Sequence, residues 1–144
     1  MLLSRLPVNP IIFGTLIAWL FAQLLKIFIV FIEDRRWNFK RFMGSGGMPS
    51  SHTTGIVTAA TLLYRYEGGM SSVFGITVII GFVIMYDASG VRREAGNHAE
   101  ILNILLEKWD DTTIVRKKFK ELIGHTPVEV IAGAALGMMI GAVL

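Results

Sequence analysis

Two of the three histidines stand at the entrance of apolar segments, where imidazole chemistry would meet the start of a helix. His52 follows a stretch rich in glycine and serine that begins at Gly44, and His125 stands directly before Thr126 and Pro127. An imidazole can serve as nucleophile, general base or general acid near neutral pH. The unpaired N–H groups at a helix start favour an anion such as phosphate. The pattern therefore predicts a phosphate pocket that contains two imidazoles.

The segments that must position these histidines are apolar enough to lie in a membrane. The 144 residues are 53% hydrophobic and 17% charged, whereas soluble domains carry about 25% charged residues. Residues 11–32 would form a helix of roughly 33 Å, enough to cross a hydrocarbon core of about 30 Å. Shorter segments at 51–66, 71–86 and 126–144 are rich in small residues, which allow close helix packing, and we predict Gly75, Gly81, Gly133 and Gly137 as packing positions. The tight turn at Glu67-Gly68-Gly69 predicts that the first two of these segments form a helical hairpin. We predict one all-α domain over residues 1–144, an integral membrane helical bundle with about four transmembrane helices; a soluble bundle with unusually apolar helices is the alternative.

The basic residues gather in the two long polar stretches between these segments. Residues 33–50 and 87–125 contain eleven of the 14 lysines and arginines. With four spans both stretches lie on the same side, and the positive-inside tendency makes that side cytoplasmic. We therefore predict a bacterial-type cytoplasmic membrane location, with the site facing the cytoplasm and both termini outside. Apolar spacing within residues 97–109 predicts an amphipathic helix on the membrane surface or against the bundle.

Several polar side chains near the histidines are candidates for binding phosphate oxygens. They are Lys26, Arg35, Arg36, Ser50, Ser51, Arg92 and Arg93, with Asp87 and Gly47 in supporting positions. Each has a structural alternative that the sequence leaves open. Lysine and arginine can extend to or anchor at the membrane surface, serines can cap a helix, and Asp87 with Arg92 can form an ion pair.

The segment after His125 also has two interpretations. Thr126, Pro127 and Glu129 form a complete capping-box signal for a helix start, which needs no catalysis. The adjacent His125 favours a catalytic role for Glu129 as well. His52, His125 and Glu129 could instead hold zinc, but their spacing matches no metal motif, so we predict no metal and no cofactor. The absence of cysteine excludes thiolate nucleophiles and cysteine-ligated metals.

Three motifs together resemble one known superfamily. Met48-Pro49-Ser50-Ser51-His52 resembles the Pro-Ser-Gly-His motif of the type 2 phosphatidic acid phosphatases and vanadium haloperoxidases. The run His125-Thr126-Pro127-Val128-Glu129-Val130-Ile131-Ala132-Gly133 is similar to their His-x-x-x-Asp-Val-x-x-Gly motif. With Tyr86-Asp87-Ala88-Ser89-Gly90-Val91-Arg92-Arg93 included, nearly the whole chain resembles the compact, divergent membrane branch of that superfamily.

The resemblance implies metal-independent phosphate chemistry with defined roles. It implies that His125 is a nucleophile that forms a phosphohistidine, that Glu129 orients it, and that His52 protonates the leaving oxygen. Lys26 matches the lysine of the first family motif. Glu33 and Phe119 stand where the family has arginines, so the replacements would come from Arg35 or Arg36 and from Arg92 or Arg93.

We therefore predict a lipid phosphate phosphatase whose substrate is a phosphomonoester or pyrophosphate of a membrane lipid. The alternative is a non-catalytic membrane scaffold, or a lipid-headgroup binder, that retains the pocket. The net charge of +3 fits an anionic bilayer surface or a phosphate-bearing substrate, so nucleic acid is not an expected partner. The family usually has six transmembrane helices, so completion of the pocket by a second subunit in a homodimer also stays open.

Overall fold

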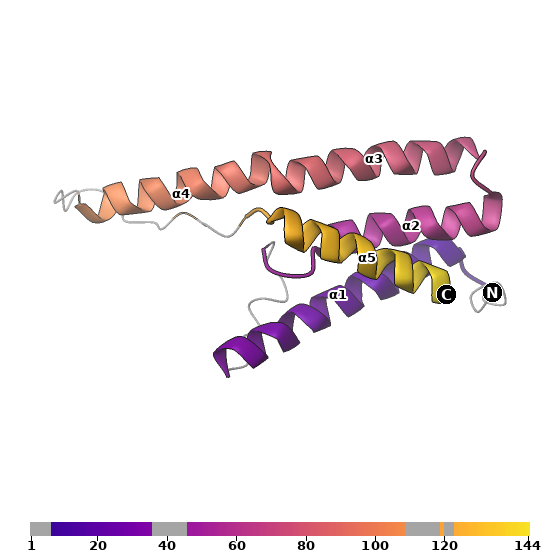
Figure 1. Ribbon diagram of the computed structural model, residues 1–144, viewed down its shortest axis with the longest axis horizontal. Coiled ribbons are helices and arrows are strands. Elements are labelled where there is room, and N and C mark those ends of the chain that lie inside the picture. The colour runs from indigo at the N-terminus through magenta and orange to yellow at the C-terminus, as the bar shows by residue number, and fades with distance from the viewer. Residues whose placement is uncertain (1–6, 36–45, 109–118, 120–122) are drawn as a thin grey trace.

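The computed structural model describes residues 7–35, 46–108, 119 and 123–144 (Figure 1). This part of the chain contains five helices: α1 (Pro10–Asp34), α2 (Ser51–Glu67), α3 (Ser72–Ser89), α4 (Val91–Lys108) and α5 (Pro127–Val143). No strand occurs among the described residues, which confirms the prediction of an all-α fold. Pro10–Ile32 and Ser72–Lys108 are long and apolar enough to cross a membrane, and α5 is a shorter apolar helix. The number of crossings stays a prediction.

Helix α2 forms the centre of the bundle and packs against α1, α3 and α5. Its contact with α5 is especially close because Gly133, Gly137 and Gly141 recur every four residues on the facing side of α5. A Cβ atom at Gly137 would lie 2.6 Å from the Thr54 carbonyl oxygen, so only glycine permits this approach. The Thr58 hydroxyl of α2 donates a hydrogen bond to the Gly137 carbonyl oxygen at 3.1 Å. Small residues thus join the two helices through backbone contact.

The two glycines Gly75 and Gly81 of α3 differ in what a side chain at their positions would contact. A Cβ at Gly81 of α3 would meet the side chain of Ile56 at 3.5 Å, so Gly81 lies at a helix contact as expected. Gly75 was expected to be a packing position too, and this prediction is wrong: among the described residues nothing lies within 4 Å of the position of its Cβ. It lies on an exposed part of α3, away from the face that packs on α2.

The turn between α2 and α3 confirms the predicted helical hairpin. Helix α2 ends at Glu67, and Gly68 turns the chain with a φ of +85°, in the left-handed region that favours glycine. The Ser71 hydroxyl donates a hydrogen bond to the Glu67 carboxylate at 2.6 Å and also caps the start of α3. The rings of Tyr64 and Phe74 pack across the turn with centroids 5.6 Å apart.

The helix ends lie in two groups, one at each end of the bundle (Figure 1). The end of α1, the start of α2, the end of α3 and the start of α5 lie at one end, whereas the α2–α3 turn and the end of α5 lie at the other. All the helix ends that border the two basic stretches therefore lie together. The side of the membrane that this end faces stays a prediction.

Helix α4 corrects the expectation for the second polar stretch. It begins at Val91, with only Gly90 between it and the end of α3, and the two helices run nearly in line (Figure 1). It extends beyond the bundle, and among the described helices it packs only with α3, so placement against the bundle is wrong. Its early start places Arg92 and Arg93 in the first helical turn rather than in a loop. The predicted end of this helix, Trp109, lies outside the described residues.

Candidate active site

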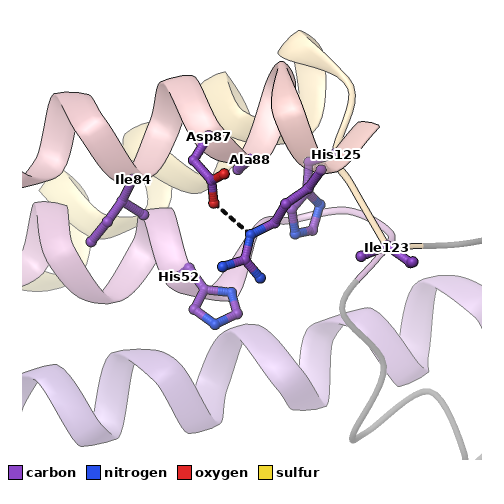
Figure 2. Close-up of a pocket in the computed structure, with 7 residues that line it drawn as sticks. His52, Ile84, Asp87, Ala88, Ile123 and His125 are labelled. Atoms are coloured by element: carbon purple, nitrogen blue, oxygen red, sulfur yellow. Dashed lines mark hydrogen bonds and ion pairs between the residues drawn. The ribbon is translucent and has the colours of Figure 1, made fainter. Parts of the chain in front are cut away.

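The two histidines singled out in the sequence line one small cavity of about 90 Å³. Figure 2 shows His52 from α2, Asp87 from α3 and His125 from the segment before α5 around this space. The complete lining is His52, Ile84, Asp87, Ala88, Arg92, Ile123 and His125. The cavity can therefore present two imidazoles and one guanidinium to a single small anion.

A backbone contact fixes His125 at this position. The N–H of His125 donates to the carbonyl oxygen of Ala88, near the end of α3, at 2.9 Å. The preceding residue, Gly124, lies so close to the next helix that a Cβ would stand 2.4 Å from the backbone nitrogen of Arg93. Only glycine fits there, so the chain can pass the α3–α4 junction closely enough to bring the imidazole into the cavity.

The starts of α2 and α5 are also joined directly through the main chain. The N–H of Ser50 donates to the carbonyl oxygen of Glu129 at 3.1 Å. Beside it, a Cβ at Gly133 would lie 2.6 Å from the Ser50 carbonyl oxygen. His52 and His125 therefore belong to two helix starts that are held against each other by backbone atoms.

Glu129 determines which ring nitrogen of His125 carries the proton and which carries the free lone pair. The Nδ1 atom of His125 lies 2.9 Å from Oε2 of Glu129. An ionised carboxylate can only accept, so Nδ1 carries the proton in the neutral ring and Nε2 carries the lone pair. Nε2 is buried and makes no hydrogen bond to any residue that the structure describes. The ring is thus set up with an unprotonated nitrogen beside the cavity.

The same carboxylate also caps α5, which confirms the capping-box interpretation of Glu129 and leaves its catalytic role a prediction. Its Oε2 accepts a hydrogen bond from the N–H of Thr126 at 3.1 Å, while the Thr126 hydroxyl accepts from the N–H of Glu129 at 3.3 Å. Pro127 occupies the first helical position. A single oxygen therefore serves both the capping box and the imidazole, and the cap positions the carboxylate that positions His125.

The surroundings of His125 favour its neutral form. The side chain is 3% exposed. Burial lowers the pKa of His125 below its usual value of 6.5, and the charges of Lys26 and Arg92 lower it further. The hydrogen bond to Glu129 and the charge of that carboxylate act in the opposite direction without reversing the shift. At neutral pH the imidazole is therefore uncharged, as an attacking nitrogen must be.

Arg92 is the basic residue that lines the cavity. Its Nε lies 2.5 Å from Oδ2 of Asp87, so the ion pair that the sequence left open is present, and both side chains face the cavity. Arg93 has an exposed side chain and is absent from the cavity lining, while its backbone packs against Gly124. Of these two arginines, Arg92 is the one that lines the cavity.

Lys26 lies buried inside the bundle. Its side chain is 1% exposed, and the position of a Cβ at Gly47 lies 3.6 Å from its Cγ. Gly47 has a φ of +91°, a conformation that side chains rarely adopt, so this loop can lie directly over the lysine. Lys26 does not line the cavity, but its charge acts on His125.

The remaining predicted phosphate ligands that the structure describes do not line this cavity. Ser50 is buried and is the N-cap of α2, with its hydroxyl accepting from the N–H and the hydroxyl of Thr53 at 3.4 and 3.0 Å. Ser51 is buried in the first turn of α2 and is absent from the cavity lining. Arg35 is exposed at the end of α1 with a φ of 54°, and Arg36 lies outside the described residues.

Three lining residues were missed by sequence reasoning: Ile84, Ala88 and Ile123. Ala88 belongs to the motif at residues 86–93, but apolar side chains carry no reactive group that would mark any of the three as a site residue. The packing of α3 against the segment before α5 brings them to the cavity. Among the described residues no cluster of three or more histidine, aspartate or glutamate side chains could hold a metal ion.

Comparisons with known proteins show the family of this chain. The model of the Divergent PAP2 family matches residues 8–140. The uncharacterized membrane protein YuiD of Bacillus subtilis (strain 168) is 36% identical over 143 residues, which cover 91% of this chain and 90% of that protein. No solved structure matches the chain. With a family match over nearly its entire length, an all-helical fold and a membrane protein as relative, this chain belongs to the Divergent PAP2 family.

Proposed function

We propose that this membrane protein is a metal-independent phosphatase that hydrolyses a phosphomonoester or pyrophosphate of a membrane lipid. The observation that carries this proposal is that His52, Arg92 and His125 line the same small cavity. A nucleophile, a proton donor and a fixed positive charge are the groups that phosphoryl transfer requires. The site faces the cytoplasm in this proposal, because the helix ends around it border the two basic stretches.

The proposed reaction proceeds in two steps. Nε2 of His125 attacks the phosphorus atom in line with the leaving oxygen, forming a P–N bond as the P–O bond breaks. The bonding electron pair stays on the leaving oxygen, and protonated His52 donates a proton to it. Water then attacks the phosphohistidine while His52 takes up a proton, which releases phosphate and restores the neutral imidazole of His125.

Two further residues lower the energy of these steps in the proposal. Glu129 stabilises the positive charge that develops on the His125 ring as Nε2 forms its new bond, because Oε2 already accepts from Nδ1. Arg92 balances the charge that spreads over the phosphoryl oxygens, and Asp87 holds its guanidinium at the cavity.

The test is an assay of purified protein against a panel of phospholipids for release of inorganic phosphate. The panel includes phosphatidic acid, phosphatidylglycerophosphate and a polyprenyl pyrophosphate. We expect release from at least one of them, unchanged by a metal chelator and inhibited by vanadate, which resembles the five-coordinate phosphorus of the transition state. Binding of these lipids without release would support the scaffold alternative, and loss of activity on chelation would support a metal enzyme.

A change at Glu129 should alter the pH profile as well as the rate. His125 must be unprotonated to attack, so kcat/KM rises with pH as the ring loses its proton, below pH 6.5 in the wild type. Glu129 raises this pKa, so Glu129→Gln should move the acidic limb to lower pH. Because the mechanism also needs protonated His52, kcat/KM passes through a maximum, and this maximum should fall by about 100-fold, since the amide no longer fixes the tautomer. The measurement is kcat/KM against pH for both proteins on one substrate, so that titration of the substrate cancels.

The control for this change is Glu67→Gln, which makes the same chemical replacement at the opposite end of the bundle. It should leave both the acidic limb and the maximum of the profile unchanged. A Glu129→Gln profile that matches the wild type in both respects would remove Glu129 from the proposed mechanism.

A further inference from the structure

A second, larger space adjoins the cavity that contains the two histidines. It is an open groove of about 450 Å³ between α1, α2 and α3. His52 and Ile84 line both the groove and the small cavity, so the two spaces meet at these side chains. The groove is also lined by Thr15, Leu16, Trp19, Ser51, Gly55, Ile56 and Ala59.

The depth of this groove comes from small residues on one face of α2. Ser51, Gly55 and Ala59 are spaced four residues apart, so they follow one another along the helix over roughly 12 Å. A Cβ at Gly55 would make only an ordinary contact, 3.6 Å from the Thr15 methyl group. This differs from Gly137, where a Cβ would collide with backbone. Close helix packing therefore does not require glycine at position 55, and its absent side chain leaves open space.

The two spaces together have the shape and polarity of an amphiphile. The small cavity presents His52, Arg92 and His125, whereas leucine, isoleucine, tryptophan and alanine dominate the groove. The groove runs between α1 and α3, which both belong to the stretches apolar enough to cross a membrane. An occupant that enters from the bilayer would thus meet the apolar walls first and place a polar end beside His52.

We propose that this groove holds the hydrocarbon chain of the substrate, so that Gly55 and Ala59 determine whether a lipid can bind with its phosphate in the cavity. The inference rests on the proposed phosphatase function. A chain that moves from the bilayer into the groove leaves one apolar environment for another, so its burial adds little affinity. The groove acts instead by orienting the lipid, which aligns the phosphorus atom with His125.

The experiment fills the groove and compares two substrates. Ala59→Leu adds bulk to the floor of the groove, away from the phosphate cavity. We expect kcat/KM for dioleoyl phosphatidic acid in mixed micelles to fall about tenfold or more, since pockets discriminate at this level against a few methylene groups. For the water-soluble ester p-nitrophenyl phosphate, kcat/KM should stay within about twofold of the wild-type value.

The matched control is Ala135→Leu, the same replacement on an exposed part of α5 outside the groove. It should change neither rate. If Ala59→Leu reduces both activities equally, or neither, the groove does not hold the chain while the phosphatase proposal stands. If the wild type releases phosphate from none of the panel lipids and not from p-nitrophenyl phosphate, the phosphatase proposal itself fails.

A second measurement needs no variant. Wild-type protein in micelles is irradiated with phosphatidic acid that carries a diazirine near the end of one chain, and the labelled peptides are identified. We expect labelling of the groove residues Leu16, Trp19 and Ile56. Labelling confined to the exposed residues of α3, such as Ile79 and Phe82, would overturn the assignment.

Discussion

Replacement of His125 by alanine is expected to lower the rate of phosphate release by about 1,000-fold or more, since it removes the nucleophile. The change leaves the backbone intact, so the hydrogen bond from the N–H of residue 125 to the Ala88 carbonyl oxygen is retained. The measurement is single-turnover phosphate release, together with acid-labile and base-stable labelling of the protein by a 32P-phosphorylated lipid. Wild type should carry the label and His125→Ala should not.

His98 provides the matched control for this experiment. It lies on the exposed surface of α4 and does not line the cavity. His98→Ala should therefore retain both release and labelling. If His125→Ala still releases phosphate at the wild-type rate, His125 is not the nucleophile and the two-step mechanism is wrong.

The second large effect is expected at Arg92. Arg92→Gln should lower kcat/KM by about 1,000-fold, the range found for arginines that stabilise a transferring phosphoryl group. Arg92→Lys should recover only part of this loss, because lysine keeps the charge but lacks the planar fork that can bind two oxygens at once. The measurement is kcat/KM for the best substrate of the panel.

A substitution at Arg93 tests whether kcat/KM depends on a positive charge at the cavity or only on a positive charge nearby. Arg93→Gln removes a neighbouring positive charge from an exposed side chain that does not line the cavity. Its effect should stay within about threefold, in the range of long-range surface electrostatics. A larger loss at Arg93 than at Arg92 would contradict the placement of Arg92 as the phosphate-binding arginine.

The sequence was sufficient to predict the helices whose first and last residues are determined by local signals. Residues 11–32 were predicted as the first span and α1 covers Pro10–Asp34, because a long apolar run and the Asn9 cap define it. The start of α5 was predicted from the capping box at Thr126. The start of α4 was not predicted, since Gly90 interrupts the helix for only one residue and the polar residues that follow resemble a loop.

The candidate site was predicted less completely, for a physical reason. The pairing of His52 with His125 followed from the number of spans, which places both at the same end of the bundle. The phosphate ligands depended on where each side chain points, which sequence spacing does not determine. Ser50 was needed as a helix cap and Lys26 lies under Gly47, so neither lines the cavity, while Arg92 reaches it through its pairing with Asp87.

The main-chain link from Ser50 to Glu129 has a consequence for how this protein tolerates change. The separation of the two helix starts that carry the imidazoles depends on the peptide groups of Ser50 and Glu129, which any residue would supply, and on Gly133, where no side chain fits. Drift of the lipid-facing side chains therefore leaves the spacing of the reactive pair untouched. Such a framework can diverge widely across its surface while preserving the one distance on which its chemistry depends.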